Sequence, residues 1–410
     1  MRILFILDSG FDTYGPSLHL YKALLEDLLK AGHTIHLIES VSTRKDPVIP
    51  ETLEHYPNFS YELIPIAIVK KNHFALRYLA GVQYCFRTIP SLKKCKGKFD
   101  VVHVQSCPWA QFAVTFAKKY VCAPTVFNIQ DMFPGSSIAA GIMPRKWMQR
   151  IFCRLQKIGY KQADVITVIS EDMKARVVSQ GVPAEKIHVI VNWYDDSFVK
   201  EIPWEENKFV QKYNMSRDIF YVQYAGTMGF VFDYKMVLTV AKNLKKYKDI
   251  VFQMIGFGSQ YDQFIAETKE RGLDNIVFYP LEPQPMVPHV YSACSICFIP
   301  LKRDIIGNSV PSKAGLLMSC RRVIVNSVDE WSDYYKMFER EDMGLSASNL
   351  DSDAVTAAIM RLYNDRTLID HFASNAQKYG NVHYSRTVNT KLYNDLYVEV
   401  GSKKILKNNV

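Results

Sequence analysis

The segment NSVPSKAGLLMSC, residues 308–320, contains the side chains best suited to hold an anion. Ser309 can cap a helix, and Pro311 is tolerated in a first helical turn because an N–H has no partner there anyway. Ser312 and Lys313 would add a hydroxyl and a positive charge beside the free N–H groups of that turn. On these residues alone the segment predicts either a phosphate site or a well-capped helix.

Two glycine-containing turns lie upstream of this segment, YAGTMG (residues 224–229) and MIGFG (residues 254–258). Each of them ends a strand pattern. Glycine lets the backbone approach a ligand closely, because no side chain intrudes, and successive N–H groups can then face a pyrophosphate. The second turn leaves room for a base or a ribose. An ordinary strand-to-helix turn is the alternative for both. The candidate ligand-binding residues here are Gly226, Thr227, Gly229, Gly256 and Gly258.

Three further candidates for chemistry lie in the first half of the chain. Gly15 and Ser17 follow the first strand pattern and could approach a phosphate or an acceptor. Asp131 ends the strand pattern in NIQDMFPGS, where a carboxylate can orient a hydroxyl or take its proton. A structural aspartate that caps the next turn fits equally well. His103 also ends a strand, and a core histidine is the favoured interpretation.

The elements that must position these residues alternate between strand and helix patterns. At 410 residues the chain should form two domains, each with its own core. The alternation predicts two tandem doubly wound Rossmann-like α/β domains, whose ligands lie beyond the carboxyl ends of the strands, in a cleft between the domains. The predicted strands cover 3–8, 34–39, 99–105, 124–131, 164–170 and 187–192, then 219–226, 250–258, 275–280, 294–301 and 321–326.

Changes in periodicity suggest the domain boundaries. Residues 1–195 form the predicted N-terminal domain, and residues 196–217 lose periodicity, gain charge and are predicted to be a linker. Residues 218–387 form the predicted C-terminal domain. The last helical segment, 388–410, is expected to pack back on the first domain.

Composition narrows the cellular setting. No apolar run is long enough for a spanning helix, and the start of the chain does not resemble a signal peptide. The eight cysteines are scattered, which fits a reducing cytosol. Cys294 and Cys297 form a C-x-x-C inside a strand pattern, where core packing is favoured over metal binding.

The net charge of +9 is concentrated in two acid-free stretches, 63–99 and 132–163, which carry eight and six Lys or Arg residues.

Residues 144–161 predict an amphipathic helix. At 100° per residue its apolar side chains share an arc of about 140°, and its basic side chains gather on the opposite flank. Such a helix can lie on an anionic membrane, or its apolar side can pack on its own domain. A nucleic acid partner is disfavoured, because the basic stretches lack interleaved stacking aromatics. The candidate membrane residues are Lys146, Trp147, Arg150, Arg154 and Lys157.

The order and spacing of YAGTMG, MIGFG and VPSKAGLLMSCRRVIV resemble the retaining nucleotide-sugar glycosyltransferases of the GT-B fold. Within these, the chain is similar to the "glycosyl transferases group 1" class of bacterial capsule, O-antigen and exopolysaccharide synthesis. The resemblance covers nearly the whole chain and implies that residues 218–387 bind the nucleotide sugar and that NSVPSK receives the donor diphosphate. The donor-binding residues that it implies are Gly226, Thr227, Gly229, Gly256, Gly258, Asn308, Ser309, Ser312 and Lys313. It also implies catalysis without a metal or other cofactor and without a positioned nucleophile.

One departure from this family concerns two glutamates separated by seven residues. Relatives use them to bind the donor sugar and the ribose, and the corresponding positions here are Asn308 and Leu316. An amide can still bond to a sugar hydroxyl, whereas leucine cannot bond to a ribose.

The resulting hypothesis is a cytoplasmic glycosyltransferase, peripheral on the inner face of the plasma membrane. It would move a sugar from a nucleoside diphosphate sugar, with UDP expected from family frequency, to a lipid-linked acceptor of bacterial surface polysaccharide. Two alternatives remain open: a non-catalytic nucleotide-sugar-binding partner of another transferase, and an NDP-sugar epimerase of similar fold.

Overall fold

The computed structural model describes residues 1–8, 10–11, 17–42, 48–67, 69 and 73–408. The chain divides into two compact units. The first unit comprises Met1–Val191 together with Asn389–Val410, and the second comprises Asn192–Val388. Helix α17 (Arg386–Asn408) starts in the second unit and continues into the first.

The first unit is built on a parallel sheet of seven strands in the order β3-β2-β1-β4-β5-β6-β7. The strands are short runs of apolar residues, and β1 buries five of its six. Continuous burial of this kind is expected when helices cover both faces of a parallel sheet. The strands are β1 (Arg2–Leu7), β2 (Thr34–Ser42), β3 (Phe59–Ile66), β4 (Val101–Gln105), β5 (Thr125–Ile129), β6 (Val165–Val168) and β7 (Ile187–Val189).

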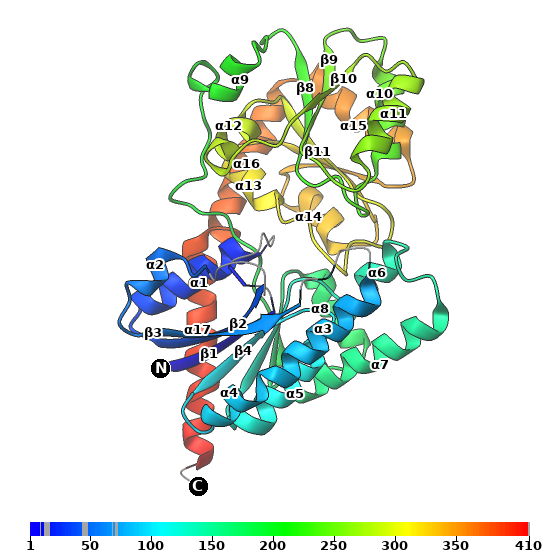
Figure 1. Ribbon diagram of the computed structural model, residues 1–410. Helices are drawn as coiled ribbons and strands as arrows, with labels where there is room; N and C mark the ends of the chain where they lie inside the picture. Colours follow the sequence, from blue (N-terminus) through cyan, green and yellow to red (C-terminus); the bar gives the residue numbers. More distant parts are fainter. Residues whose placement is uncertain (9, 12–16, 43–47, 68, 70–72, 409–410) are drawn as a thin grey trace. The chain divides into compact units, whose positions relative to one another are not determined.

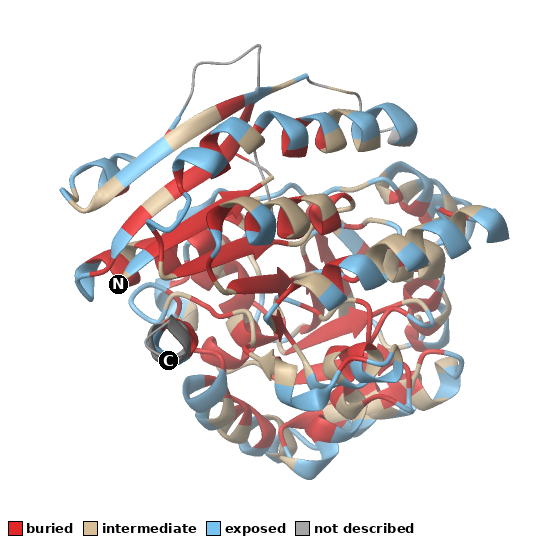
Figure 2. Ribbon diagram, turned by 90° about the horizontal axis from the view of Figure 1, so that it is seen from below, coloured by how far each residue is buried: buried red, intermediate tan, exposed pale blue. Residues whose placement is uncertain are grey.

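Helices α3, α5 and α7 lie on one face of this sheet (Figure 1), and in Figure 2 the strands are buried while the outer sides of the surface helices are exposed. In the described part of the chain, no helix combines the length and the apolar character needed to cross a bilayer. The helices of the first unit are α1 (Leu18–Lys30), α2 (Glu51–Glu54), α3 (Phe74–Arg87), α4 (Ile89–Lys94), α5 (Ala110–Val121), α6 (Gly135–Ala139), α7 (Lys146–Gln162) and α8 (Glu171–Ser179), with a 3-10 turn at Ala184–Lys186 and most of α17.

Helix α17 is fixed to the first unit by buried polar contacts. The Tyr397 hydroxyl lies 2.8 Å from Nδ1 of His103, which is fully buried and stacked on Phe5. The Asn128 amide donates to the Tyr393 hydroxyl over 2.6 Å. His103 is therefore the core histidine that the sequence favoured.

Burial lowers the pKa of His103 to about 3, so the native protein holds this ring neutral. The unfolded chain takes up a proton below its ordinary pKa of about 6.5, and the native state does not. We therefore expect the contribution of His103 to stability to be complete above pH 6.5. It should then decrease by about 1.4 kcal/mol for each pH unit between about 6.5 and 3.

The measurement is the midpoint of thermal unfolding between pH 7.5 and 5 for the wild type and His103→Gln. The variant should lose less stability than the wild type over this range. Parallel curves would contradict the prediction.

The second unit repeats the architecture with six parallel strands in the order β10-β9-β8-β11-β12-β13. Its core is rich in buried phenylalanines, including Phe232, Phe252, Phe264 and Phe298. Both sheets extend from the first strand in both directions, as in doubly wound folds. The strands are β8 (Phe220–Ala225), β9 (Ile250–Ile255), β10 (Ile276–Tyr279), β11 (Ile296–Pro300), β12 (Ile324–Val328) and β13 (Gly344–Ser348).

The helices of the second unit are α9 (Lys208–Lys212), α10 (Tyr234–Leu244), α11 (Tyr261–Glu270), α12 (Val287–Ser292), α13 (Ala314–Ser319), α14 (Asp333–Arg340), α15 (Ser352–Asn364) and α16 (Thr367–His383), with 3-10 turns at Trp204–Glu206 and Gln284–Met286. The predicted α/β fold with two doubly wound domains is confirmed. Within residues 196–217 the chain forms a 3-10 turn and α9, and Asn207 caps α9 while donating to the His289 carbonyl.

The predicted helix start near residue 309 is wrong. Helix α13 begins only at Ala314 and has six residues, and its start carries no side-chain cap. Before it, the N–H groups of Asn308 and Ser309 both donate to the Ile305 carbonyl, so Ser309 belongs to a turn. The helix N-terminus therefore lies directly after Lys313, five residues beyond Ser309.

Candidate active site

The two predicted glycine turns of the second unit pack backbone against backbone. Gly226 follows β8 and Gly256 follows β9, and both have positive φ values, +144° and +127°. A Cβ atom at Gly256 would lie 2.2 Å from the Gly226 carbonyl oxygen, and one at Gly258 would lie 2.3 Å from that of Met228. These contacts require glycine, so the two turns form one surface at the carboxyl edge of the sheet.

Some backbone donors of this surface already have partners. The Gly226 N–H donates to the Ile255 carbonyl over 2.9 Å, and the Met228 N–H donates to the Phe257 carbonyl over 2.8 Å. Neither N–H serves a ligand in this conformation. The expectation of backbone binding by the YAGTMG turn therefore has to rest on Thr227 and Gly229, whose role stays a prediction.

Lys313 lies directly against the first glycine turn. Its Nζ donates to the Ala225 carbonyl over 3.1 Å and stands 3.7 Å from the centre of the Tyr224 ring. A Cβ at Gly226 would approach Nζ to 2.6 Å, so the absence of a side chain makes room for the ammonium. The structure thus brings together two predicted donor-binding segments that are 88 residues apart in the chain.

The surroundings of Lys313 affect its charge. Burial lowers the pKa of Lys313 to about 7, against a smaller opposing effect of Cys297. An ammonium in a site of low polarity gains strongly from an anionic ligand, because the partner replaces lost hydration. The ammonium and the glycine surface together form an arrangement suited to a phosphate.

Two residues missed by the sequence analysis contribute to the same edge. Gln260 donates through Nε2 to the carbonyls of Gly229 and Phe232, and its Oε1 accepts from Lys302 over 3.0 Å. Lys302 follows β11 closely, so a second cation is held near the glycine surface. A lysine just beyond the carboxyl end of a predicted strand was the available signal.

The other residues predicted to bind the sugar donor differ in burial and in hydrogen bonding. Asn308 is only 2% exposed, and its Nδ2 donates to the Asp304 carbonyl over 2.9 Å. Its amide therefore shapes its own turn. Ser309 is half-buried and Ser312 is exposed, while Leu316 is half-buried.

A buried carboxylate that sequence reasoning did not single out also supports this turn. Asp329 follows β12, is 3% exposed and accepts through Oδ1 from the Asp304 N–H over 2.9 Å. Its Oδ2 has no hydrogen-bond partner among the described residues. The turn that carries Asn308 is thus held by a carboxylate from the neighbouring strand.

In the first unit, Asp131 lies just beyond β5 and is exposed. It lines a pocket of about 350 Å³, a volume that includes space open to solvent. Ser17 lies at the start of α1 and accepts a hydrogen bond from the Gln105 amide over 3.2 Å, at the end of β4. Gly15 lies outside the described residues.

The predicted amphipathic helix is α7, and its apolar arc divides into two parts. Phe152 and Leu155 are half-buried, whereas Trp147, Ile151 and Ile158 are 57%, 45% and 45% exposed. Packing of α7 on α5 is close at Gly159, where a Cβ would lie 3.3 Å from the Gln111 Cα. The basic side chains Lys146, Arg150, Arg154 and Lys157 are all exposed.

Comparison with known proteins agrees with this architecture. Residues 20–198 match the family model of Glycosyltransferase Family 4. The probable glycosyltransferase WbjE of Pseudomonas aeruginosa is 23% identical over 307 residues, which cover 74% of this chain and 76% of that protein. The putative colanic acid biosynthesis glycosyl transferase WcaI of Escherichia coli is 21% identical over 206 residues, covering 47% and 48% of the two chains.

Solved structures show the same fold. The structure of HepE from Anabaena in complex with UDP has a TM-score of 0.73 at 15% identity, and the alignment covers 97% of this chain and 99% of that chain. HepE has also been solved with UDP-glucose, with a TM-score of 0.71. The chain thus has the GT-B fold, and its sequence is similar to that of glycosyltransferases, one of them from colanic acid biosynthesis.

Proposed function

We propose that this glycosyltransferase transfers a sugar from a nucleoside diphosphate sugar to a lipid-linked acceptor during bacterial surface-polysaccharide assembly, with retention of configuration. The observation that carries the proposal is the Lys313 ammonium, held against the glycine turn at Gly226. UDP is the proposed nucleotide, supported by the HepE complexes with UDP and UDP-glucose.

In this proposal the donor site works by charge stabilisation. Negative charge develops on the leaving diphosphate, and fixed positive charges lower the energy of that transition state. Lys313 supplies the nearest charge, and Ser309 and Ser312 supply hydroxyl donors. Asp131 orients the acceptor hydroxyl or takes its proton. We expect neither a positioned nucleophile nor a metal to be required.

A non-catalytic nucleotide-sugar-binding protein is the second candidate. It is favoured by one observation: the Asn308 amide donates to the Asp304 carbonyl, and Leu316 offers no group that could bond to a ribose. Such a protein would bind the donor without transferring its sugar.

One experiment separates the two candidates. Thermal shift with UDP, GDP, ADP and their sugars identifies the nucleotide, since a ligand of the native state raises the unfolding midpoint. Turnover of the sugars that bind is then followed with EDTA present, using lipid extracts as acceptor. Binding with hydrolysis or transfer supports the enzyme, whereas binding without either, for every donor and with metal restored, supports the non-catalytic protein.

We further propose that α7 lies on an anionic membrane. Its exposed apolar side chains Trp147, Ile151 and Ile158 form a row on the surface of the described chain, and apolar surface of this kind can mark a membrane contact. Exposed bases flank this row, and each Lys or Arg near an anionic leaflet contributes about 1 kcal/mol. Membrane binding would bring the enzyme to a lipid-linked acceptor.

The variant Lys146→Glu/Arg150→Glu/Arg154→Glu should lose at least tenfold in partitioning onto anionic vesicles at low salt. The matched control, Lys242→Glu/Lys246→Glu/Lys248→Glu, makes the same charge change at exposed residues of the second unit and should bind like the wild type. Cosedimentation with anionic and neutral vesicles at two salt concentrations measures both. Equal partitioning of all three proteins would show that α7 is only a packed surface helix.

A further inference from the structure

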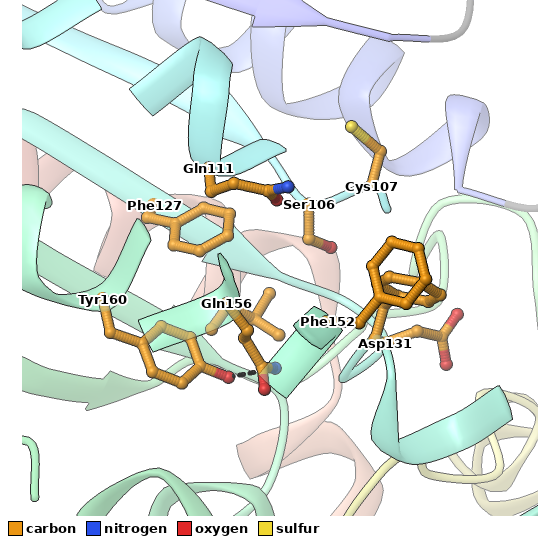
Figure 3. A pocket seen from close by; sticks show the side chains of 10 residues that line it. Ser106, Cys107, Gln111, Phe127, Asp131, Phe152, Gln156 and Tyr160 are labelled. Carbon is orange, nitrogen blue, oxygen red and sulfur yellow. Dashed lines mark hydrogen bonds between the residues drawn. The ribbon is translucent and has the colours of Figure 1, made fainter. Parts of the chain in front are cut away.

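Nucleophilic side chains lie beyond strand ends in both units. In the first unit the thiol of Cys107, one of the side chains in Figure 3, lies just beyond β4. Burial raises the pKa of Cys107 well above its ordinary value, so the sulfur keeps its proton and is a weak nucleophile. Burial has the opposite effect on an amine, because its protonated form is the charged one. Of these two groups, only the Lys313 amine of the second unit is therefore activated by its surroundings.

The groups around the Lys313 amine do little to keep it protonated. The nearby titratable side chains are Tyr224 from β8, Cys297 from β11 and Tyr291 from α12, whose hydroxyl donates to the Ala225 carbonyl over 3.4 Å. Burial raises the pKa of all three, so they are uncharged near pH 7. Among the described residues, no carboxylate raises the pKa of Lys313, and Cys297 alone opposes the effect of burial.

The amine is both neutral and fixed in place. With a pKa of about 7, about nine tenths of the Lys313 side chains are neutral at pH 8, against less than about one hundredth for the ordinary lysine pKa of about 10.4. A neutral amine has two N–H groups and one lone pair. Nζ uses an N–H for the Ala225 carbonyl over 3.1 Å, which holds the nitrogen without using its lone pair. Lys313 thus has the properties of a desolvated, nucleophilic lysine.

The position of this amine favours an electrophile that carries a phosphate. Nζ lies against the Gly226 turn, in space that a side chain at Gly226 would take. Gln260 holds the Lys302 ammonium over 3.0 Å at the same edge of the sheet. Lys313 is only half-buried, so a small molecule can reach it. Positive charge at this edge concentrates anionic reagents and leaves uncharged ones unaffected.

We propose that Lys313 is acylated by acyl phosphates, whose phosphate binds where the donor diphosphate binds. The inference rests on the proposed donor site and adds a means of regulating it. The Nζ lone pair attacks the acyl carbon, an N–C bond forms, and the C–O bond to the phosphate breaks. Inorganic phosphate leaves with the electron pair of that bond, and the nitrogen gives up one proton to water. The amide that remains is uncharged and no longer neutralises a diphosphate.

The experiment treats the full chain with acetyl phosphate at pH 8 and follows each lysine by peptide mass spectrometry. Lys313 should be acetylated at least about tenfold faster than Lys242, an exposed lysine of α10. With p-nitrophenyl acetate, an uncharged reagent, the ratio of the two rates should be at least about fivefold smaller. Saturating UDP should protect Lys313 from acetyl phosphate and leave the rate at Lys242 unchanged.

The effect on the donor site is measured by titration with UDP. Acetylated wild type should bind UDP at least about tenfold more weakly than the untreated protein. The control is Lys313→Arg, whose guanidinium stays protonated and is not a nucleophile at pH 8. This variant should have the same affinity for UDP before and after the treatment.

The outcomes separate the inference from the proposed function. Acetylation of Lys313 no faster than that of Lys242, or the same ratio of rates with both reagents, would overturn the inference. The proposed donor site would still stand if UDP raises the unfolding midpoint of that protein. Preferential, phosphate-dependent acetylation of a protein that binds no nucleoside diphosphate would support the lysine site and contradict the proposed function.

Discussion

Lys313→Ala is expected to weaken the binding of the nucleoside diphosphate at least tenfold. A hydrogen bond to a charged group contributes about 1.5–3 kcal/mol, and about 1.4 kcal/mol corresponds to a factor of ten in affinity. The fold should tolerate the change, because the side chain only spans from the N-cap of α13 to the Ala225 carbonyl and the Tyr224 ring. Isothermal titration with the nucleotide that the wild type binds measures the effect, and Lys242→Ala, at an exposed lysine of α10, serves as the control.

The same residue gives the binding a pH dependence. Since the pKa of Lys313 is about 7 without ligand, the side chain loses its proton as the pH rises from 7 to 9. A diphosphate stabilises the charged form, so binding above pH 7 must take up a proton, and the affinity should fall with rising pH. Lys313→Arg, which stays charged, should show a flat profile over this range. An unchanged wild-type affinity from pH 7 to 9, or full affinity in Lys313→Ala, would remove Lys313 from the donor site.

Gly256→Ala is expected to separate the two glycine turns and to abolish nucleotide binding. The new Cβ would lie 2.2 Å from the Gly226 carbonyl oxygen, and the φ of +127° is one that L-residues rarely adopt. Backbone strain and overpacking each cost about 1–3 kcal/mol. Because the obstacle is a backbone oxygen, no side chain can rotate away to relieve the contact.

The control for this prediction is Gly272→Ala. Gly272 also has a positive φ, +60°, but a Cβ there would meet nothing within 4 Å. Gly272→Ala should therefore lower the free energy of unfolding only through conformational strain, by about 1 kcal/mol. Thermal unfolding should show a clearly larger loss for Gly256→Ala, and nucleotide titration should show binding only in the Gly272 variant. Equal losses in the two variants would mean that the contact between the turns is not what glycine is needed for.

The fold could be predicted because its determinants are local. Runs such as that of β1, buried on both faces, are typical of strands in a parallel sheet, and the order of these runs along the chain fixed the doubly wound topology. The contact between Lys313 and the Gly226 turn is not local, and only the resemblance to a known family suggested that the two segments meet.

The failures arise where tertiary contacts override local preference. Ser309 is a residue type typical of an N-cap. Its N–H, however, donates to the Ile305 carbonyl within a turn, and α13 starts five residues later. Lys302 and Asp329 act through partners 42 and 25 residues away, to which no spacing rule points. For α7 the hydrophobic periodicity correctly predicted an amphipathic helix. It could not show which part of the apolar arc packs against the first unit and which part is exposed.

The path of α17 has a consequence for how the protein is made. Synthesis begins with residues 1–191 of the first unit. The hydrogen-bond partners of His103 and Asn128, Tyr397 and Tyr393, are translated only after the whole of the second unit. Until then, apolar rings such as Phe5 lack part of their cover. The second unit is therefore synthesised as one continuous stretch. The first unit is complete only when the last turns of α17 have been synthesised. A nascent chain that stalls before residue 389 would hold one finished unit and one that chaperones can still recognise as incomplete.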